Sequence, residues 1–413
     1  MHFSTLVVSP LVAASIVQAA CTNGKKGHRR HHAKIVPTTT DTSSGSAYTQ
    51  ALAVNPKQDN NSWSGTWSSS SDSDSSSTDS WSSATSTAVA SASSSTSTSS
   101  SSTSTTGYSL SGIKKNGIYV GMLPDDGSGG GTATTMAALN SALGMQGAAQ
   151  GWYAQAQSGV AFDGSQLLPR MADIKASGGV FQPAVMPTGG WGGLTASDNS
   201  QAVNICNVMK KFTDEGIEVW LRFAHEVNYY QTDGTYTGNA ADFKAGWAAV
   251  AAACKSIAPE VKMWFTPNVA DLAQYDEYYP DDPSTVDIIG IDWYPSDATT
   301  SFVDGVQPFH DKYTSSTTKF AQGETGLAQA GSISDRLTWL TQMTSSATAS
   351  ALPNLISISW FNYYKGYEFR IVDVTGQSAV SHPSLFRLPY ELLTSSSFAD
   401  HLLPLIISLG AHS

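Results

Sequence analysis

Eight short apolar runs, rich in β-branched and aromatic residues, recur between residues 118 and 361, and the stretches between them are long enough for helices. Such alternation favours parallel strands joined by right-handed crossovers, and eight units in succession favour a closed barrel over an open sheet. The sequence therefore predicts an α/β fold, a (β/α)₈ TIM barrel. The predicted strands are 118–122, 151–156, 180–186, 217–223, 261–266, 286–292, 318–322 and 355–361, and the clearest predicted helices are 171–176, 241–257 and 332–343.

A stretch rich in Ser and Thr precedes the barrel, because 33 of the 46 residues from 61 to 106 are of these two types. Such a stretch cannot bury enough apolar surface to offset the chain entropy lost on folding, so we predict a disordered linker. The barrel is then one large folded domain. The predicted segments are a signal peptide at 1–19, a basic propeptide-like segment at 20–41, the linker at 42–112, the barrel domain at 113–390 and a tail at 391–413.

The N-terminal region also carries signals of export. Residues 4–20 are apolar and end in small residues, and the stretch is too short and too interrupted for a membrane span. Asn60 begins a glycosylation sequon. We therefore expect an extracellular monomer without a membrane span, either secreted or associated with a cell wall. Cys206 and Cys254, on successive predicted helices, could form a disulfide there, and two buried free thiols are the other interpretation.

Charge and spacing exclude several kinds of partner. With 22 Lys and Arg against 33 Asp and Glu the net charge is −11, so binding to nucleic acid is not expected. The glycine-rich residues 127–131 lack the spacing of a phosphate-binding loop, and we expect a flexible loop. The acidic pairs at 125–126 and 281–282 lack the ligand spacing of a known calcium loop. We predict no cofactor and no metal.

Two carboxylates follow apolar strands. Glu226 comes after the fourth predicted strand, and Glu324 after the seventh, between two glycines. Side-chain alternation places Arg222, Ala224 and Glu226 on one face. Barrel enzymes carry their chemistry at the carboxyl ends of the strands, and strands four and seven face each other across the mouth. The two acids can therefore lie on opposite sides of one bond, as a retaining glycosidase requires.

Four segments carry a family resemblance. LRFAHEVNYY at 221–230, YYP and VDIIGIDWYP within 278–295, QGETG at 322–326 and SWFN at 359–362 together resemble glycoside hydrolase family 26, best known for endo-β-1,4-mannanases. The resemblance covers about residues 117–373, and the His-Glu pair at 225–226 is its most specific element. It implies a 4/7-type barrel that hydrolyses glycosidic bonds by retention.

The resemblance also implies roles for individual residues. Glu226 matches the general acid/base and Glu324 the nucleophile, while His225 matches a histidine that orients the carboxylates. Tyr294 corresponds to a tyrosine that hydrogen-bonds the nucleophile, and Trp360 to an aromatic platform beneath the sugar. Ordinary core packing against helices is the other interpretation of Trp360.

Two further residues are expected at the site on their chemistry. Arg222 is a cation that could keep Glu324 ionised, although a structural ion pair explains it nearly as well. Trp293 offers an apolar ring to a sugar.

The expected activity is that of a mannan endo-1,4-β-mannosidase acting by double displacement on a β-linked polysaccharide. The third strand lacks the histidine that many mannanases carry there, and Gln182 stands nearby. The substrate is therefore open between mannan and another β-glycan, such as 1,3- or mixed-linkage glucan, xylan or galactan. A non-catalytic carbohydrate-binding wall protein on the same barrel is the alternative from a different class.

Overall fold

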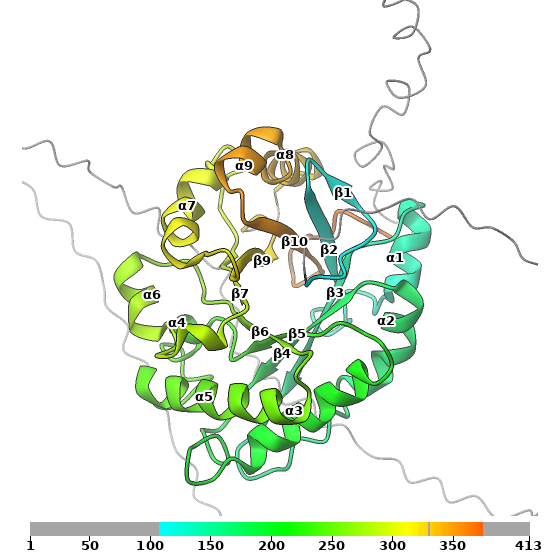
Figure 1. Ribbon diagram of the computed structural model, residues 1–413. Helices are drawn as coiled ribbons and strands as arrows, with labels where there is room; N and C mark the ends of the chain where they lie inside the picture. The colour runs from blue at the N-terminus through cyan, green and yellow to red at the C-terminus, as the bar shows by residue number, and fades with distance from the viewer. Residues whose placement is uncertain (1–106, 329–330, 375–413) are drawn as a thin grey trace, which may run out of the picture. The chain divides into compact units, whose positions relative to one another are not determined.

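The computed structural model describes residues 107–328 and 331–374. The predicted signal peptide, basic segment, most of the linker and the tail lie outside the described residues. Within them, eight parallel strands close into a barrel surrounded by helices (Figure 1), as predicted. The closing contact pairs Met122 with Gln150. Around the barrel the strands are β2 (Ile118–Pro124), β10 (Leu355–Asn362), β9 (Lys319–Thr325), β7 (Ile288–Ile289), β6 (Lys262–Phe265), β5 (Trp220–Phe223), β4 (Val180–Met186) and β3 (Ala149–Gln155).

Two short strands extend this barrel. β1 (Lys114–Lys115) pairs antiparallel with β2. The predicted strand 286–292 is divided, because β8 (Asp292–Trp293) follows β7 after a break at Gly290 and also pairs with β9. A side chain at Gly290 would place its Cβ 1.9 Å from the carbonyl oxygen of Ala321. The glycine therefore lets the two chain segments approach where the strand is interrupted.

Several helices between the strands begin at side-chain caps, among them those capped by Thr135 and by Ser301. Asn239 and Ser332 each form a capping box, and these caps fix the starts of two predicted helices. Among the described residues, none of the helices has the length and apolar character needed to cross a membrane. In chain order the helices are α1 (Met136–Leu143), α2 (Met171–Ser177), α3 (Ser200–Thr213), α4 (Val227–Tyr230), α5 (Ala240–Ile257), α6 (Leu272–Tyr278), α7 (Phe302–Tyr313), α8 (Ile333–Met343) and α9 (Ser346–Ala351).

An apolar layer fills the amino-terminal end of the barrel. Its inward-facing side chains include Trp220 and Trp264, whose rings meet edge to face at 5.7 Å. Tyr108 packs on this layer, with its ring 5.6 Å from Trp220 and its hydroxyl donating to the carbonyl oxygen of Asp287. Residues 107–112, assigned to the linker from the sequence, therefore include contacts that belong to the barrel. The opposite end holds the carboxyl termini of the strands.

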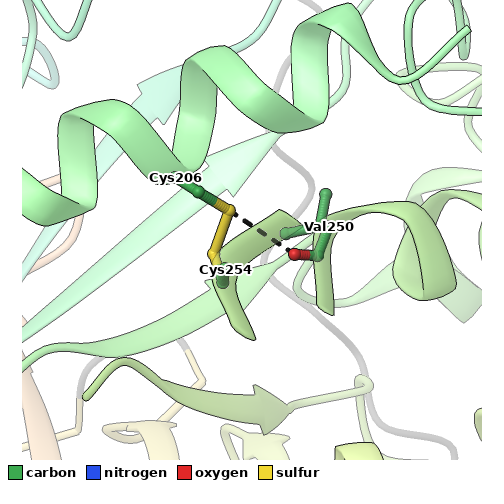
Figure 2. Close-up of a disulfide and its surroundings, with 3 residues drawn as sticks. All are labelled: Cys206, Val250 and Cys254. Carbon is green, nitrogen blue, oxygen red and sulfur yellow. Dashed lines mark hydrogen bonds between the residues drawn. A yellow bond between two sulfur atoms is a disulfide. The ribbon is translucent and has the colours of Figure 1, made fainter. Parts of the chain in front are cut away.

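A disulfide joins two neighbouring helices of the outer ring. Cys206 in α3 and Cys254 in α5 are bonded, with their Cα atoms 4.9 Å apart. Cys206 Sγ also lies 3.4 Å from the carbonyl oxygen of Val250 (Figure 2). Of the two interpretations of these cysteines, the structure adopts the disulfide.

Replacing both cysteines by alanine should lower the free energy of unfolding. The bond closes a loop with a sequence separation of 48, so it restricts the unfolded chain. The chain-entropy relation gives a loss of about 4 kcal/mol for a loop of this length. Urea unfolding followed by tryptophan fluorescence measures it, with the wild type in reducing buffer as a second test. An unchanged urea midpoint in both experiments would show that the bond does not stabilise the fold.

Candidate active site

Glu226 reaches the mouth of the barrel through a turn and not through a continued strand. β5 ends at Phe223, and both Ala224 and Glu226 adopt a φ of 51°, a conformation unusual for residues with a Cβ. The Glu226 amide donates to the carbonyl oxygen of Thr266 at 2.7 Å, which ties the turn to the end of β6. The expected strand alternation therefore holds for Arg222 but not for Glu226. Strained backbone of this kind is often found at active sites.

Two asparagines, one in α4 and one after β6, bind each other beside this turn. Asn228 Nδ2 donates to the carbonyl oxygen of Asn268 at 2.9 Å, and the Asn268 amide donates back to Asn228 Oδ1 at 2.8 Å. The Asn268 side chain lies beside the Glu226 carboxyl. This reciprocal pair fixes the surroundings of Glu226.

Glu324 lies in β9 and is bound on both carboxylate oxygens. Arg222 Nη1 donates to Oε1 at 2.9 Å, and the Tyr294 hydroxyl donates to Oε2 at 2.9 Å. His225 Nε2 lies 3.8 Å from Oε1. A Cβ at Gly323 would lie 2.2 Å from Asp292 Oδ1, so the glycine before Glu324 permits this close approach. The nucleophile candidate is therefore held in one orientation.

Arg222 connects Glu324 to buried residues of the neighbouring strands. Its guanidinium binds Glu324 through Nη1 and Asp292 through Nη2, while Nε lies 3.3 Å from Thr266 Oγ1. Arg222, Asp292 and Glu324 are all buried. The guanidinium also lies 5.5 Å from the Trp264 ring in the apolar layer below. One buried cation thus binds two carboxylates, and one of them is that of Glu324.

The two glutamates titrate on opposite sides of their ordinary range. Burial, followed by the charge of Glu324, raises the pKa of Glu226 to about 8. Burial also works to raise the pKa of Glu324, but the charge of Arg222 and side-chain hydrogen bonds outweigh it and hold that pKa below its usual value. At neutral pH the site therefore contains a protonated acid and an ionised carboxylate, the arrangement in which one carboxyl donates a proton while the other attacks.

His225 is neutral at working pH. Burial, followed by the nearby charge of Arg222, lowers its pKa to about 3. Its ring is packed between Tyr153 and Tyr230, each with a centroid 5.5 Å away. His225 Nδ1 is buried and has no hydrogen-bond partner among the described residues. A neutral imidazole beside Glu324 can orient the carboxylate without adding charge.

A cluster of residues with metal-ligand spacing already binds a cationic side chain of the protein. The ligand atoms of His225, Asp292 and Glu324 lie within 4.8 Å of one another, which is a spacing that a metal could use. The guanidinium of Arg222 bridges Asp292 and Glu324, however. The arrangement is therefore explained by an internal ion pair.

The predicted tryptophans are not at the mouth. Trp293 packs between Phe302 of α7 and Trp339 of α8, and Gly305 of α7 gives its ring room. Its ring therefore faces the helices, and the expected contact with a sugar does not fit this placement. The structure brings together Arg222, His225, Glu226, Tyr294 and Glu324 and does not bring Trp293 to them.

Trp360 also lies on the outward face of its strand. Its neighbour Ser359 points into the barrel, where it donates to Gln182 Oε1 at 2.6 Å, so alternation turns Trp360 outward. Trp360 is completely buried, and its Nε1 donates to the carbonyl oxygen of Phe369. It has no exposed ring face for a sugar. The half-buried ring of Phe361 lies on the inward side instead, 5.8 Å from Tyr294.

Sequence reasoning missed two residues of the site. Asp292 lies inside the motif GIDWYP, and its position after an apolar strand was the same signal that identified Glu324. Tyr153 lies on the inward face of β3 beside His225, and only the correct alternation of the second strand could have identified it.

The glycine-rich residues 127–131 pack against the loop after β10. Gly130 forms an antiparallel bridge with Lys365, and a Cβ at Gly129 would lie 2.4 Å from the carbonyl oxygen of Tyr364. Asp125 accepts from the Tyr364 amide at 2.8 Å and fixes the same contact. The glycines thus allow two backbones to approach closely, and the loop is held by contacts that the sequence did not predict.

Comparisons with known proteins show the fold. No family model and no curated protein matches the chain. A modular endo-β-1,4-mannanase of glycoside hydrolase family 26 from Cellulomonas fimi superposes with a TM-score of 0.50 at 15% identity, over 67% of this chain and 72% of that one. The chain therefore has the fold of the family 26 mannanases.

Weaker structural likenesses accompany this one. The catalytic domain of a family 26 endo-β-1,4-mannanase from Bacillus sp. JAMB-750 has a TM-score of 0.43 at 20% identity, over 65% of this chain and 83% of that one. A fungal β-1,4-galactanase has a TM-score of 0.47 at 14% identity, over 65% of this chain and 98% of that one.

Proposed function

We propose that this chain is a retaining glycoside hydrolase that cleaves a β-linked polysaccharide, with mannan as the first candidate. The observation that carries the proposal is the pair of buried glutamates at opposite strands of one barrel mouth. Glu226 has its pKa raised to about 8, and the pKa of Glu324 is lowered. Two carboxyls with opposite protonation states are what double displacement needs.

The first half of the reaction forms a covalent intermediate. Protonated Glu226 gives its proton to the glycosidic oxygen while the bond from that oxygen to the anomeric carbon breaks. The ionised Glu324 carboxylate forms a bond to the same carbon from the opposite face, and the leaving sugar departs as an alcohol. Arg222 and Tyr294 hold the attacking carboxylate in place.

The second half releases the sugar. Glu226, now ionised, removes a proton from a water molecule as the water oxygen bonds to the anomeric carbon. The bond to Glu324 breaks, and both glutamates return to their starting protonation states. Two inversions at one carbon retain its configuration.

Mannan is favoured as substrate by the sequence motifs and by the fold shared with a protein described as an endo-β-1,4-mannanase. Gln182 lies in the region where the resemblance led us to expect a histidine, and its Oε1 accepts a hydrogen bond from the Ser359 hydroxyl. This difference concerns the sugar that is recognised and not the two glutamates. Other β-glycans therefore belong in the test.

The test is reducing-sugar release from purified β-mannan, 1,3-glucan, mixed-linkage glucan, xylan and galactan, followed by sizing of the products. We expect release from mannan with oligosaccharide products, as endo action gives. Release from another of the glycans alone would keep the hydrolase and change its substrate. Binding without release from any of them would instead favour the non-catalytic wall protein.

We also propose that the protein acts outside the cell. The Cys206–Cys254 disulfide supports an oxidising compartment, as does the apolar N-terminal stretch of the sequence. Detection of the protein in culture medium or on the wall, against a cytosolic marker, tests this placement.

The pH dependence of kcat/KM should be bell-shaped. Raising the pH through about 8 removes the proton that Glu226 must donate, so activity falls on the alkaline side. Lowering the pH protonates Glu324, but only below the usual glutamate value of 4.5, because its pKa is lowered. Initial rates across the pH range measure both limbs. An alkaline limb at the ordinary glutamate value would contradict the assignment of Glu226 as the acid.

A further inference from the structure

Tyr153 places a hydroxyl group at the nucleophile that the mechanism above does not use. Its neighbour Trp152 belongs to the outer core and carries the Arg170 guanidinium on its ring at 3.6 Å, so alternation turns Tyr153 into the barrel. There its ring lies 5.5 Å from His225 and 6.3 Å from Tyr363, centroid to centroid. These packed rings hold the tyrosine on the β3 side of Glu324.

The hydroxyl of Tyr153 is close to Glu324 but loosely engaged. It lies beside the carboxylate and helps to hold that carboxyl's pKa down, yet within the described part of the chain it makes no hydrogen bond of ordinary geometry, and it is buried. Burial, then the charge of Glu324, raises the pKa of Tyr153 well above its usual value. The group is therefore a protonated donor at any working pH.

The Glu324 carboxylate can accept a further hydrogen bond from Tyr153. Arg222 and Tyr294 each donate once, to different carboxylate oxygens, whereas a carboxylate offers about four lone-pair sites. Hydrogen bonds in catalytic sites are often long without substrate and tighten when it binds. A buried hydroxyl without a good partner does not stabilise the fold, so stability does not explain its presence.

We propose that Tyr153 is a positioning residue, whose hydroxyl hydrogen-bonds the Glu324 carboxylate when substrate is bound. Arg222, Tyr294 and Tyr153 come from three different strands or strand ends, so together they prevent the carboxylate from rotating away from the anomeric carbon. This inference rests on the proposed function, because it concerns the nucleophile of that reaction.

The kinetic test is Tyr153→Phe, which removes the hydroxyl and keeps the ring. We expect kcat/KM to fall about 10- to 100-fold, mainly through kcat, as when one preorganised donor is removed from a catalytic site. The Tm should be unchanged or higher, because no well-formed bond is lost. The control is Tyr108→Phe, which removes a tyrosine hydroxyl at the amino-terminal end of the barrel, and its kcat/KM should stay within about threefold of wild type. A Tyr153→Phe rate within threefold of wild type, or a loss accompanied by an equal fall in folded fraction, would overturn the proposal.

A titration of the Glu324 carboxyl tests the role of Tyr153 without measuring the proposed activity. Carboxyl ¹³C NMR of glutamate-labelled protein, with Glu324→Gln to assign the signal, follows the Glu324 carboxyl directly. The charged and titratable groups around Tyr153 are Glu324, Arg222, His225, Tyr294 and Tyr363, and all remain in the variant. Losing a donor should raise the Glu324 midpoint. Should the wild type hydrolyse no glycan, the proposed function fails, and an unmoved midpoint would then overturn the positioning role as well.

Discussion

The Glu324→Gln variant is expected to lose about 10⁴-fold or more in kcat while remaining folded. An amide is a very poor nucleophile, so the covalent step has no attacking group. The glutamine side chain nevertheless keeps the size of the glutamate and one of its oxygens. That oxygen can still accept from Arg222 Nη1, which now donates to Oε1 at 2.9 Å. The measurement combines rates on the polysaccharide that the wild type cleaves with thermal unfolding.

The matched control for this variant is Glu277→Gln, which makes the same change on the exposed side of α6. It should keep full activity. In Glu324→Ala, added azide should restore part of the rate by attacking the anomeric carbon in place of the carboxylate, forming a glycosyl azide of inverted configuration. More than a few per cent of wild-type activity in a folded Glu324→Gln protein would contradict the assignment of the nucleophile.

The Arg222→Met variant should be strongly destabilised. Removing the guanidinium leaves Asp292 and Glu324 buried side by side without their shared cation. Breaking a buried ion pair in this way costs about 3–5 kcal/mol of unfolding free energy. The folded fraction should also be nearly inactive, because the pKa of Glu324 rises when the cation is lost. Urea unfolding and rates per folded protein measure the two effects.

A second substitution distinguishes the destabilisation caused by unpaired buried carboxylates from the destabilisation caused by lost packing of the Arg222 side chain. Arg222→Met combined with Asp292→Asn removes one of the two uncompensated carboxylates, so it should recover part of the stability without recovering activity. Arg222→Lys keeps the charge but loses the two-armed contact and should fall between wild type and Arg222→Met. Equal stability of Arg222→Met and wild type would show that the guanidinium does not support the site.

The barrel was predictable because its signal is repeated. Eight apolar runs at regular intervals identify the strands even where single boundaries shift, as at 286–292, which is divided at Gly290. Both glutamates were proposed as site residues for a related reason, since a carboxylate that follows an apolar strand is costly unless it is used. The start of the domain was placed too late, because the packing of Tyr108 against Trp220 is a tertiary contact with no local signal.

The direction of side chains was the weaker part of the prediction. In β10 side chains alternate regularly, with Ser359 inward and Trp360 outward, but tertiary packing and not the spacing of the residues sets which of the two faces is the inward one. Trp293 follows a break in its strand at Gly290, so alternation along the strand does not predict its direction. Aromatic residues therefore could not be assigned to the mouth or to the helices from spacing alone. Tyr153 was missed for the same reason.

The most direct measurement is the anomeric configuration of the first product. Proton NMR during hydrolysis of the cleaved β-glycan distinguishes the two anomers before they interconvert in solution. Two glutamates acting by double displacement predict that the β-anomer appears first and the α-anomer only later. First appearance of the α-anomer would mean direct attack by water, and Glu324 would then not be the nucleophile.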